Sequence, residues 1–309
     1  MDPSGREYTL RCRKKFRREG ISPLTGDEIR FSPGEGESHG WIEEIFPRRS
    51  ETLRPPCANL TLLVFVAAPV PETDWLLADR LIARAFGQGL KALIVVNKSD
   101  LSASTTTTTP APASSPTPSS SSTPASAPLA DRVRAQYAPA GIPVLSVSAA
   151  TGAGLSPLRE ALKGETACFA GQSGVGKTSL LNALLGTMSE TGEISQRISR
   201  GKNTTRSAEL YLRNGLRIVD SAGFNLLEAE KGLAPDLLKD RYPEFRPFEG
   251  RCRFRGCLHD REPGCAVRAA AESSQPPAPP PVSPVSRERW ERYRLLLEEL
   301  RLQWDHRWE

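Results

Sequence analysis

The chain is poor in cysteine and histidine, with six cysteines and three histidines among 309 residues. Cys12, Cys57 and Cys168 each stand alone, and the other three cysteines cluster near the C-terminus. This spacing is too uneven for a disulfide framework. It excludes a small secreted protein stapled by disulfides and favours a reducing compartment.

Long hydrophobic runs are also missing. No apolar segment is long enough to span a bilayer, and the N-terminal MDPSGREYTLRCRKKF has no apolar core of signal-peptide length. Asp2 and Glu7 argue against a transit peptide, because such peptides are poor in acidic residues. We therefore expect a cytoplasmic protein without a membrane partner. The net charge of +5 favours polyanions such as nucleic acid or nucleotide phosphates.

A chain of this length is expected to hold two or three domains. Residues 102–128 and 273–284 contain too little apolar sequence to offset the entropy of ordering them, which predicts a disordered insertion and a linker. An O-glycosylated stalk is the competing interpretation of the first stretch. The motif NKSD directly before it favours a lengthened cytoplasmic loop.

The sequence between these stretches has the pattern of an α/β domain. Residues 60–68 and 92–97 are apolar runs typical of buried parallel strands, and residues 74–89 carry apolar side chains at helical spacing. Further strands are expected at 142–149, 166–173 and 216–223. Residues 1–55 instead contain short alternating segments separated by turns. They predict a small antiparallel module of OB type, beginning inside the barrel without its first strand region.

A phosphate-binding loop is expected directly after the strand TACFA. Gly171, Gly176, Lys177 and Thr178 satisfy the pattern G-x-x-x-x-G-K-[ST] and open a helix, where backbone N–H groups can cradle phosphates. Lys177 can reach the β- and γ-phosphates, and Thr178 can ligate Mg²⁺. The expected nucleotide contacts in this loop are Gly171, Ser173, Gly174, Val175, Gly176, Lys177, Thr178 and Ser179. A glycine-rich turn without a ligand is the alternative.

Two further motifs follow strand ends. Asp220 and Gly223 match D-x-x-G, in which the carboxylate can hold Mg²⁺ and the glycine N–H can meet a γ-phosphate oxygen. Asn97, Lys98 and Asp100 match N-K-x-D, whose aspartate accepts hydrogen bonds that guanine offers and adenine does not.

The motif N-K-x-D predicts GTP in preference to ATP. Ser148 and Ala149 fit the S-A-K motif that binds guanine O6, although Ala150 replaces its lysine.

The order of these motifs is shuffled relative to ordinary GTPases, because N-K-x-D precedes the phosphate loop. A nucleotide site is assembled at the carboxyl edge of a parallel sheet, so its loops can arrive there in any chain order. The order predicts a circularly permuted P-loop GTPase. It also places the D-x-x-G switch directly before the C-terminal part of the chain.

A metal site is expected near the C-terminus. Cys252, Cys257, His259 and Cys265 have the spacing C-x4-C-x-H-x5-C, enough for a closed tetrahedral zinc site of structural type. A chance cluster of free thiols is the alternative.

Both ends of the chain carry basic and amphipathic segments. Arg11, Arg13, Lys14, Lys15, Arg17 and Arg18 alternate with apolar residues as in a strand with a basic face, which can contact RNA or form a solvated surface. Residues 286–309 form an amphipathic helix with Ser286 as a candidate N-cap. This helix can pack on the cysteine-rich segment or dock on a partner.

Together these motifs resemble the ribosome small-subunit-dependent GTPase family RsgA, also called YjeQ. The resemblance rests on LRPPCANL, NKSD, SVSAATGAGL, GQSGVGKTSLLNAL, SRGKNTTR, DSAGF and CRFRGCLHDREPGCAVRAA, which span most of the chain. It implies an OB module over residues 1–55, a permuted GTPase domain over 56–246 and a zinc module over 247–309. It also implies a monomer that matures the 30S subunit, contacts 16S rRNA and hydrolyses GTP slowly until the subunit stimulates it.

Three residues depart from the expected patterns. Asn203 precedes Thr204 and Thr205, where the family usually has histidine, and Ala222 replaces the usual proline of D-x-P-G. Phe224 stands where Ras-like enzymes place a water-orienting glutamine, so hydrolysis is expected to be slow without a partner. The family itself carries a hydrophobic residue there. The rival hypothesis is a scaffold that binds GTP as an assembly switch and barely hydrolyses it.

Overall fold

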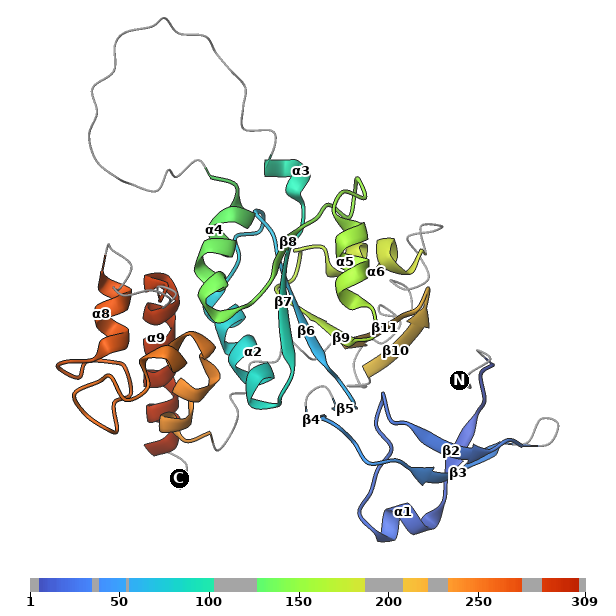
Figure 1. Cartoon of the computed structure of the whole chain (residues 1–309). Coiled ribbons are helices and arrows are strands. Elements are labelled where there is room, and N and C mark those ends of the chain that lie inside the picture. Colours follow the sequence, from blue (N-terminus) through green and yellow to red (C-terminus); the bar gives the residue numbers. More distant parts are fainter. Residues whose placement is uncertain are drawn as a thin grey trace, which may run out of the picture.

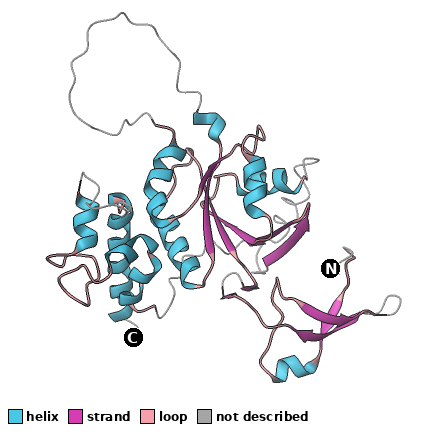
Figure 2. Cartoon of the chain, viewed as in Figure 1, coloured by secondary structure: helices cyan, strands magenta, loops and turns pink. Residues whose placement is uncertain are grey.

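The computed structural model of the protein describes residues 6–34, 39–53, 56–102, 127–186, 208–221, 233–273 and 285–305. A six-stranded sheet with helices on both faces forms the centre, and a small sheet and a group of helices form the N- and C-terminal parts (Figures 1 and 2). Nearly all of the two predicted linkers, residues 103–126 and 274–284, lies outside the described residues. In the part of the chain that is described, none of the helices combines the length and apolarity needed to cross a membrane.

The central sheet has the strand order β10-β11-β9-β6-β7-β8. Its strands are β6 (Leu62–Ala67), β7 (Lys91–Val96), β8 (Val144–Ser146), β9 (Thr166–Ala170), β10 (Ala208–Arg213) and β11 (Leu216–Ser221). The five strands expected from the sequence are all present and pair in parallel, while β10 joins the edge antiparallel to β11. Since β6 and β9 are neighbours, their carboxyl ends bring distant parts of the chain to one edge of the sheet.

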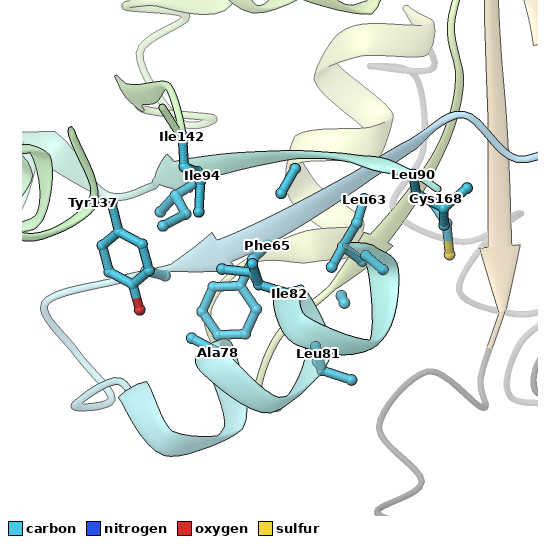
Figure 3. Packing of buried hydrophobic residues seen from close by; sticks show 14 of the residues in the cluster. Leu63, Phe65, Ala78, Leu81, Ile82, Leu90, Ile94, Tyr137, Ile142 and Cys168 are labelled. Atoms are coloured by element: carbon cyan, nitrogen blue, oxygen red, sulfur yellow. The ribbon is translucent and has the colours of Figure 1, made fainter. Parts of the chain in front are cut away.

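The central strands β6, β7 and β9 are covered on both faces of the sheet, which explains why they are almost wholly apolar. In β6 every residue is buried, and successive side chains point to opposite faces. Phe65 packs toward α2 (Trp75–Gly87) and α4 (Leu129–Tyr137), as Figure 3 shows with Ala78, Ile82 and Tyr137 around it. Val64 packs toward α5 (Leu155–Leu162) and α6 (Lys177–Leu185) on the other face. The predicted α/β class is confirmed.

The N-terminal part contains a three-stranded sheet of order β1-β3-β2. Its strands are β1 (Leu10–Cys12), β2 (Ile29–Ser32) and β3 (Gly40–Ile45), and a separate hairpin pairs β4 (Glu51–Leu53) with β5 (Pro56–Ala58). Arg48, which follows β3, forms an ion pair with the buried carboxylate of Asp27, with 2.7 Å between Nε and Oδ1. The prediction of a β-sheet here is confirmed.

Two details of the N-terminal prediction were wrong. β1 pairs with β3 in parallel rather than antiparallel. The basic run does not continue as a strand, because Lys14–Arg18 form helix α1 and only one apolar side chain of that helix, Phe16, is buried. A single helical turn places Phe16 inward and leaves Lys14, Lys15 and Arg18 exposed, which an extended strand would not do for adjacent residues.

The described residues of the C-terminal part, 233–273 and 285–305, form short helical turns and two longer helices. They are η3 (Pro235–Leu237), η4 (Lys239–Arg241), η5 (Pro243–Phe248), α8 (Ala266–Glu272) and α9 (Arg287–Asp305). Ser286 caps α9 as expected, since its Oγ accepts a hydrogen bond from the Arg289 N–H at 3.3 Å. The apolar face of α9 packs on the other helices of this part through Trp290, Tyr293 and Leu297. The predicted packing role is confirmed, and docking on a partner stays a prediction.

Candidate nucleotide site and cysteine-histidine cluster

The predicted phosphate loop connects β9 to α6 at the carboxyl edge of the sheet. Two glycines fix its shape. Gly171 has a φ of 140°, and a Cβ there would lie 2.3 Å from the Val66 carbonyl oxygen. Gly176 caps α6 with a φ of 90°. Both backbone conformations strongly favour glycine, so the loop geometry follows from the residue types.

The lysine of this motif is bound to carbonyl oxygens of the loop, whereas its hydroxyl side chains are exposed. Lys177 Nζ donates to the carbonyl oxygens of Gly171 and Gln172, at 2.6 Å and 2.7 Å, so the ammonium sits inside the curve of the loop. Ser173 is exposed in the loop, Thr178 and Ser179 are exposed at the start of α6, and Val175 is buried. The N-terminus of α6 and the lysine together make this loop suited to an anion.

Asn97, at the end of β7, forms hydrogen bonds with the phosphate loop and with the loop that carries Ala149. Its side chain is buried; Nδ2 donates to the Val175 carbonyl oxygen at 3.0 Å, and Oδ1 accepts from the Ala149 N–H at 3.1 Å. Lys98 adopts a φ of 59° and donates from Nζ to the Gly174 carbonyl oxygen at 2.7 Å. The structure therefore brings the N-K-x-D motif, the phosphate loop and the S-A motif into direct contact.

The structure describes only some of the remaining predicted residues. Asp100 lies in the short helix α3 (Ser99–Ser102), half-buried, two residues after Lys98. Ser148 is buried, and its Oγ accepts from the Thr151 N–H at 3.2 Å, which shapes the loop that carries Ala149. The backbone of Asp220 lies near the end of β11, at the same sheet edge as the phosphate loop. Thr204, Thr205 and Gly223, together with Asn203, Ala222 and Phe224, lie outside the described residues.

The loop of residues 68–74, between β6 and α2, also contributes to the site and was not predicted from the sequence. The Asp74 N–H donates to Gln172 Oε1 at 2.8 Å, and the Val70 carbonyl oxygen accepts from Lys98 Nζ at 2.7 Å. A Cβ at Gly174 would lie 3.5 Å from Pro71 Cδ. The only signal in the sequence was the position of this loop after a buried parallel strand, which places it at the same edge.

Replacing Gly176 by Ala should damage the site severely. The added Cβ would lie 2.5 Å from Asn97 Nδ2, on a residue whose positive φ already disfavours a side chain. We expect GTP affinity to fall by roughly two orders of magnitude, because both the loop and Asn97 must shift. Gly164→Ala is the matched control, since Gly164 also has a positive φ but nothing lies within 4 Å of its added Cβ. Equal GTP affinities of the two variants, measured by equilibrium titration, would contradict this explanation.

The predicted metal ligands converge in the C-terminal part. One ligand atom from each of Cys252, Cys257, His259 and Cys265 lies within 4.8 Å of all the others. His259 Nδ1 is 3.7 Å from Cys252 Sγ and 3.6 Å from Cys265 Sγ. A tetrahedral site with metal–sulfur bonds of about 2.3 Å requires ligand separations of this order. Three sulfurs and one imidazole are the donors that zinc prefers in structural sites, so the residues fit that metal.

The surroundings of the cluster hold its ligands in place. Backbone N–H groups of Ala266 and Arg268 donate to Cys252 Sγ and Cys265 Sγ at 3.4 Å and 3.3 Å. Trp290 Nε1 of α9 donates to the His259 carbonyl oxygen at 2.7 Å.

Burial also shifts the pKa of three residues of the cluster, Cys257, His259 and Cys265. Burial raises the pKa of Cys257 to about 12 and also raises that of Cys265, while burial and then Lys239 lower the pKa of His259. The imidazole is therefore neutral at pH 7, as a metal ligand must be, and a divalent cation would reverse the shifts of the thiols.

Comparison with known proteins places the chain in a family. The family model described as RsgA GTPase matches residues 122–230. The protein named small ribosomal subunit biogenesis GTPase RsgA from Ruminiclostridium cellulolyticum is 37% identical over 298 residues, covering 95% of this chain and 87% of that protein. Its namesake from Geobacillus thermodenitrificans is 37% identical over 271 residues, covering 87% of this chain and 85% of that protein.

Solved structures agree with the sequence comparison. YjeQ from Thermotoga maritima superposes with a TM-score of 0.74 at 28% identity, covering 97% of this chain and 92% of that one. YloQ, described as a circularly permuted GTPase, superposes with a TM-score of 0.69 at 26% identity, covering 95% and 86%.

The fold, the glycine-fixed loop after β9 and the shuffled order of the motifs define a circularly permuted P-loop GTPase, an enzyme that hydrolyses GTP. Within that class, the chain belongs to the RsgA family of small ribosomal subunit biogenesis GTPases.

Proposed function

We propose that the chain hydrolyses GTP in the site described above while it acts in late maturation of the 30S ribosomal subunit. The observation that carries the proposal is Asn97, which joins the guanine-reading motif to the phosphate loop through the Val175 carbonyl oxygen. In this assignment the guanine lies against Asp100, Ser148 and Ala149, with Lys98 beneath it. The phosphates lie in the loop from Gly171 to Ser179.

Hydrolysis would proceed by in-line attack of water on the γ-phosphate. Lys177 neutralises charge on the β- and γ-phosphates, Thr204 or Thr205 closes over the γ-phosphate, and the Gly223 N–H meets one of its oxygens. Thr178 and Asp220 would hold Mg²⁺, which supplies charge neutralisation between the β- and γ-phosphates. Because Phe224 cannot orient water, the small subunit would complete the site and stimulate turnover.

The experiment that tests this function measures phosphate release from GTP by the full chain, with increasing amounts of purified 30S subunits. We expect slow release by the chain alone and a rise of at least tenfold that saturates with subunit concentration, because the partner supplies what Phe224 cannot. ATP in place of GTP is the control for the guanine-reading residues. A rate that does not respond to subunits at any concentration would contradict the proposal and leave the scaffold hypothesis.

Contact with 16S rRNA would involve the exposed basic side chains at both ends of the chain. Arg11, Lys14, Lys15 and Arg18 are exposed in the N-terminal part, and Arg251, Arg253 and Arg255 are exposed beside the cysteine-histidine cluster. Arg13 forms an ion pair with Glu43, so less of its charge is available to a partner. These charges would contact phosphates, so affinity for 16S rRNA should fall steeply with salt. RNA binding that is independent of ionic strength in a filter assay would contradict this interpretation.

We expect the factor to act as a cytoplasmic monomer.

The cysteine-histidine cluster would hold one structural zinc ion. We expect about one equivalent of zinc in the purified chain by elemental analysis, and its loss in Cys257→Ser together with a large drop in melting temperature. Cys12→Ser is the matched control, because Cys12 is an exposed free thiol outside the cluster. Less than about half an equivalent in the unaltered chain would speak against the metal.

A further inference from the structure

The loop of residues 68–74 contacts both nucleotide-binding motifs at once. Its Val70 carbonyl oxygen is bound by Lys98 of the guanine-reading motif, and its last residue, Asp74, donates its N–H to Gln172 of the phosphate loop. The loop is closed on itself by Thr73, whose hydroxyl donates to the Ala68 carbonyl oxygen at 3.0 Å and accepts from the Ala68 N–H at 3.1 Å. A displacement of this loop would therefore reach both motifs.

Helix α2 continues directly from this loop. Asp74 is its N-cap and accepts a hydrogen bond from the Leu77 N–H at 2.9 Å, so the loop and the first turn of the helix are joined. Asp79, little more than one turn further on, is fully buried. A buried carboxylate needs partners, and both of its oxygens are bound by arginines of α9.

The ion pairs between α9 and α2 centre on Arg289. Its side chain is 2% exposed and bridges Asp79 Oδ1, 2.8 Å from Nη1, to Glu244 Oε1, 2.6 Å from Nε. The guanidinium also lies over the rings of Tyr137 and Tyr242, with 4.5 Å and 5.1 Å to the ring centroids. Although burial lowers the pKa of Arg289, Asp79 and Glu244 raise it above the usual value, so the side chain stays charged. Arg292 binds the second oxygen of Asp79.

We propose that Arg289 is a positioning residue for the nucleotide site, acting through Asp79, helix α2 and the 68–74 loop on Gln172 and Lys98. The inference rests on the nucleotide site of the proposed function. It adds a connection to that site from the C-terminal part. Figure 1 shows α2 and α4 lying beside the C-terminal part. Arg289 is far along the chain from every nucleotide motif, and its bond to Asp79 ends on α2, whose preceding loop contacts two of these motifs. A shift of α9 is thereby transmitted to nucleotide affinity.

The test measures the dissociation rate of fluorescently labelled GDP from the full chain, at a temperature well below the melting point of each variant. Arg289→Lys keeps the charge but replaces the planar fork that spans Asp79 and Glu244 with a single ammonium. We expect GDP to leave roughly threefold to tenfold faster. Arg287→Lys is the matched control on the same helix, since Arg287 is exposed and pairs only at the surface with Glu291. It should release GDP at the unaltered rate.

A second variant keeps the test decisive if Arg289→Lys does not fold. Gln172→Ala removes the bond to the Asp74 N–H at the far end of the route, at a half-buried surface position. It should speed GDP release by a similar factor. Where both single variants fold, the double variant should be no faster than the faster single one, because both changes interrupt one route.

The outcomes separate the two proposals. If the unaltered chain binds GDP but folded Arg289→Lys and Gln172→Ala release it at the unaltered rate, the route is wrong and the nucleotide site stands. Effects that multiply in the double variant also overturn the route. If the unaltered chain binds no GDP, both proposals are overturned.

Discussion

Replacing Asp100 by Asn is expected to weaken GTP binding by roughly 10²-fold to 10⁴-fold and to shift the preference toward xanthosine triphosphate. The aspartate carboxylate would accept two hydrogen bonds from the guanine N1–H and the exocyclic amine. An asparagine amide turns one acceptor into a donor, which then faces the donor of the base. Xanthine carries a carbonyl oxygen where guanine carries the amine, so it can accept from the new amide.

Equilibrium titration with GTP, ATP and xanthosine triphosphate measures this change. Asp131→Asn is the matched control, because it also removes one carboxylate, from an exposed i,i+3 pair with Arg134 on α4. The control should bind GTP as the unaltered chain does. If Asp100→Asn discriminates between GTP and ATP as well as the unaltered chain, Asp100 does not read the base.

Lys177→Ala should abolish most of the hydrolysis, lowering the rate of phosphate release at saturating GTP by roughly 10²-fold to 10³-fold. Lys177 Nζ lies inside the phosphate loop, on the carbonyl oxygens of Gly171 and Gln172. From there it can reach the phosphate oxygens whose charge grows in the transition state, and alanine offers nothing in its place.

Single-turnover phosphate release, with and without 30S subunits, measures the loss. Lys163→Ala is the control, because this lysine is exposed and pairs only with Glu160 at the surface. Both the basal and the stimulated rate should fall in Lys177→Ala and persist in Lys163→Ala. A Lys177→Ala rate within threefold of the unaltered one would remove Lys177 from the mechanism.

The central strands β6, β7 and β9 could be predicted because they are buried on both faces of the sheet. Runs such as LLVFVA in β6 are apolar throughout, which is a local signal of a parallel strand under two layers of helices. The edge strand β10 was not predicted, although a signal existed. Asn214 and Gly215 both have positive φ in the turn between β10 and β11, and an Asn-Gly pair between two alternating segments is typical of a hairpin.

The N-terminal part was harder because its geometry depends on distant residues. Alternation in Leu10–Arg18 suggested a strand throughout, but burial of Phe16 stabilises a helix after Cys12. The parallel pairing of β1 with β3 is equally non-local, since the intervening residues carry no signal for strand direction.

The nucleotide motifs were predictable because their residue types follow from the ligand, whereas their supports were not. Glycine, lysine, asparagine and aspartate occur at fixed spacing where phosphate and guanine chemistry demands them. Gln172, Asp74 and Arg289 contact residues far away in the chain; Asp79 and Arg289, for example, are 210 positions apart. Such pairings become visible only once the fold brings them together.

A crystal structure of the chain with Mg²⁺ and a non-hydrolysable GTP analogue is the most direct test of the central claim, that loops in shuffled chain order form one nucleotide site. A single nucleotide should span them, with its guanine on Asp100 and Ala149 and its phosphates between Gly171 and Thr178. An analogue that contacts Lys177 while its base lies away from Asn97 and Asp100 would contradict the account.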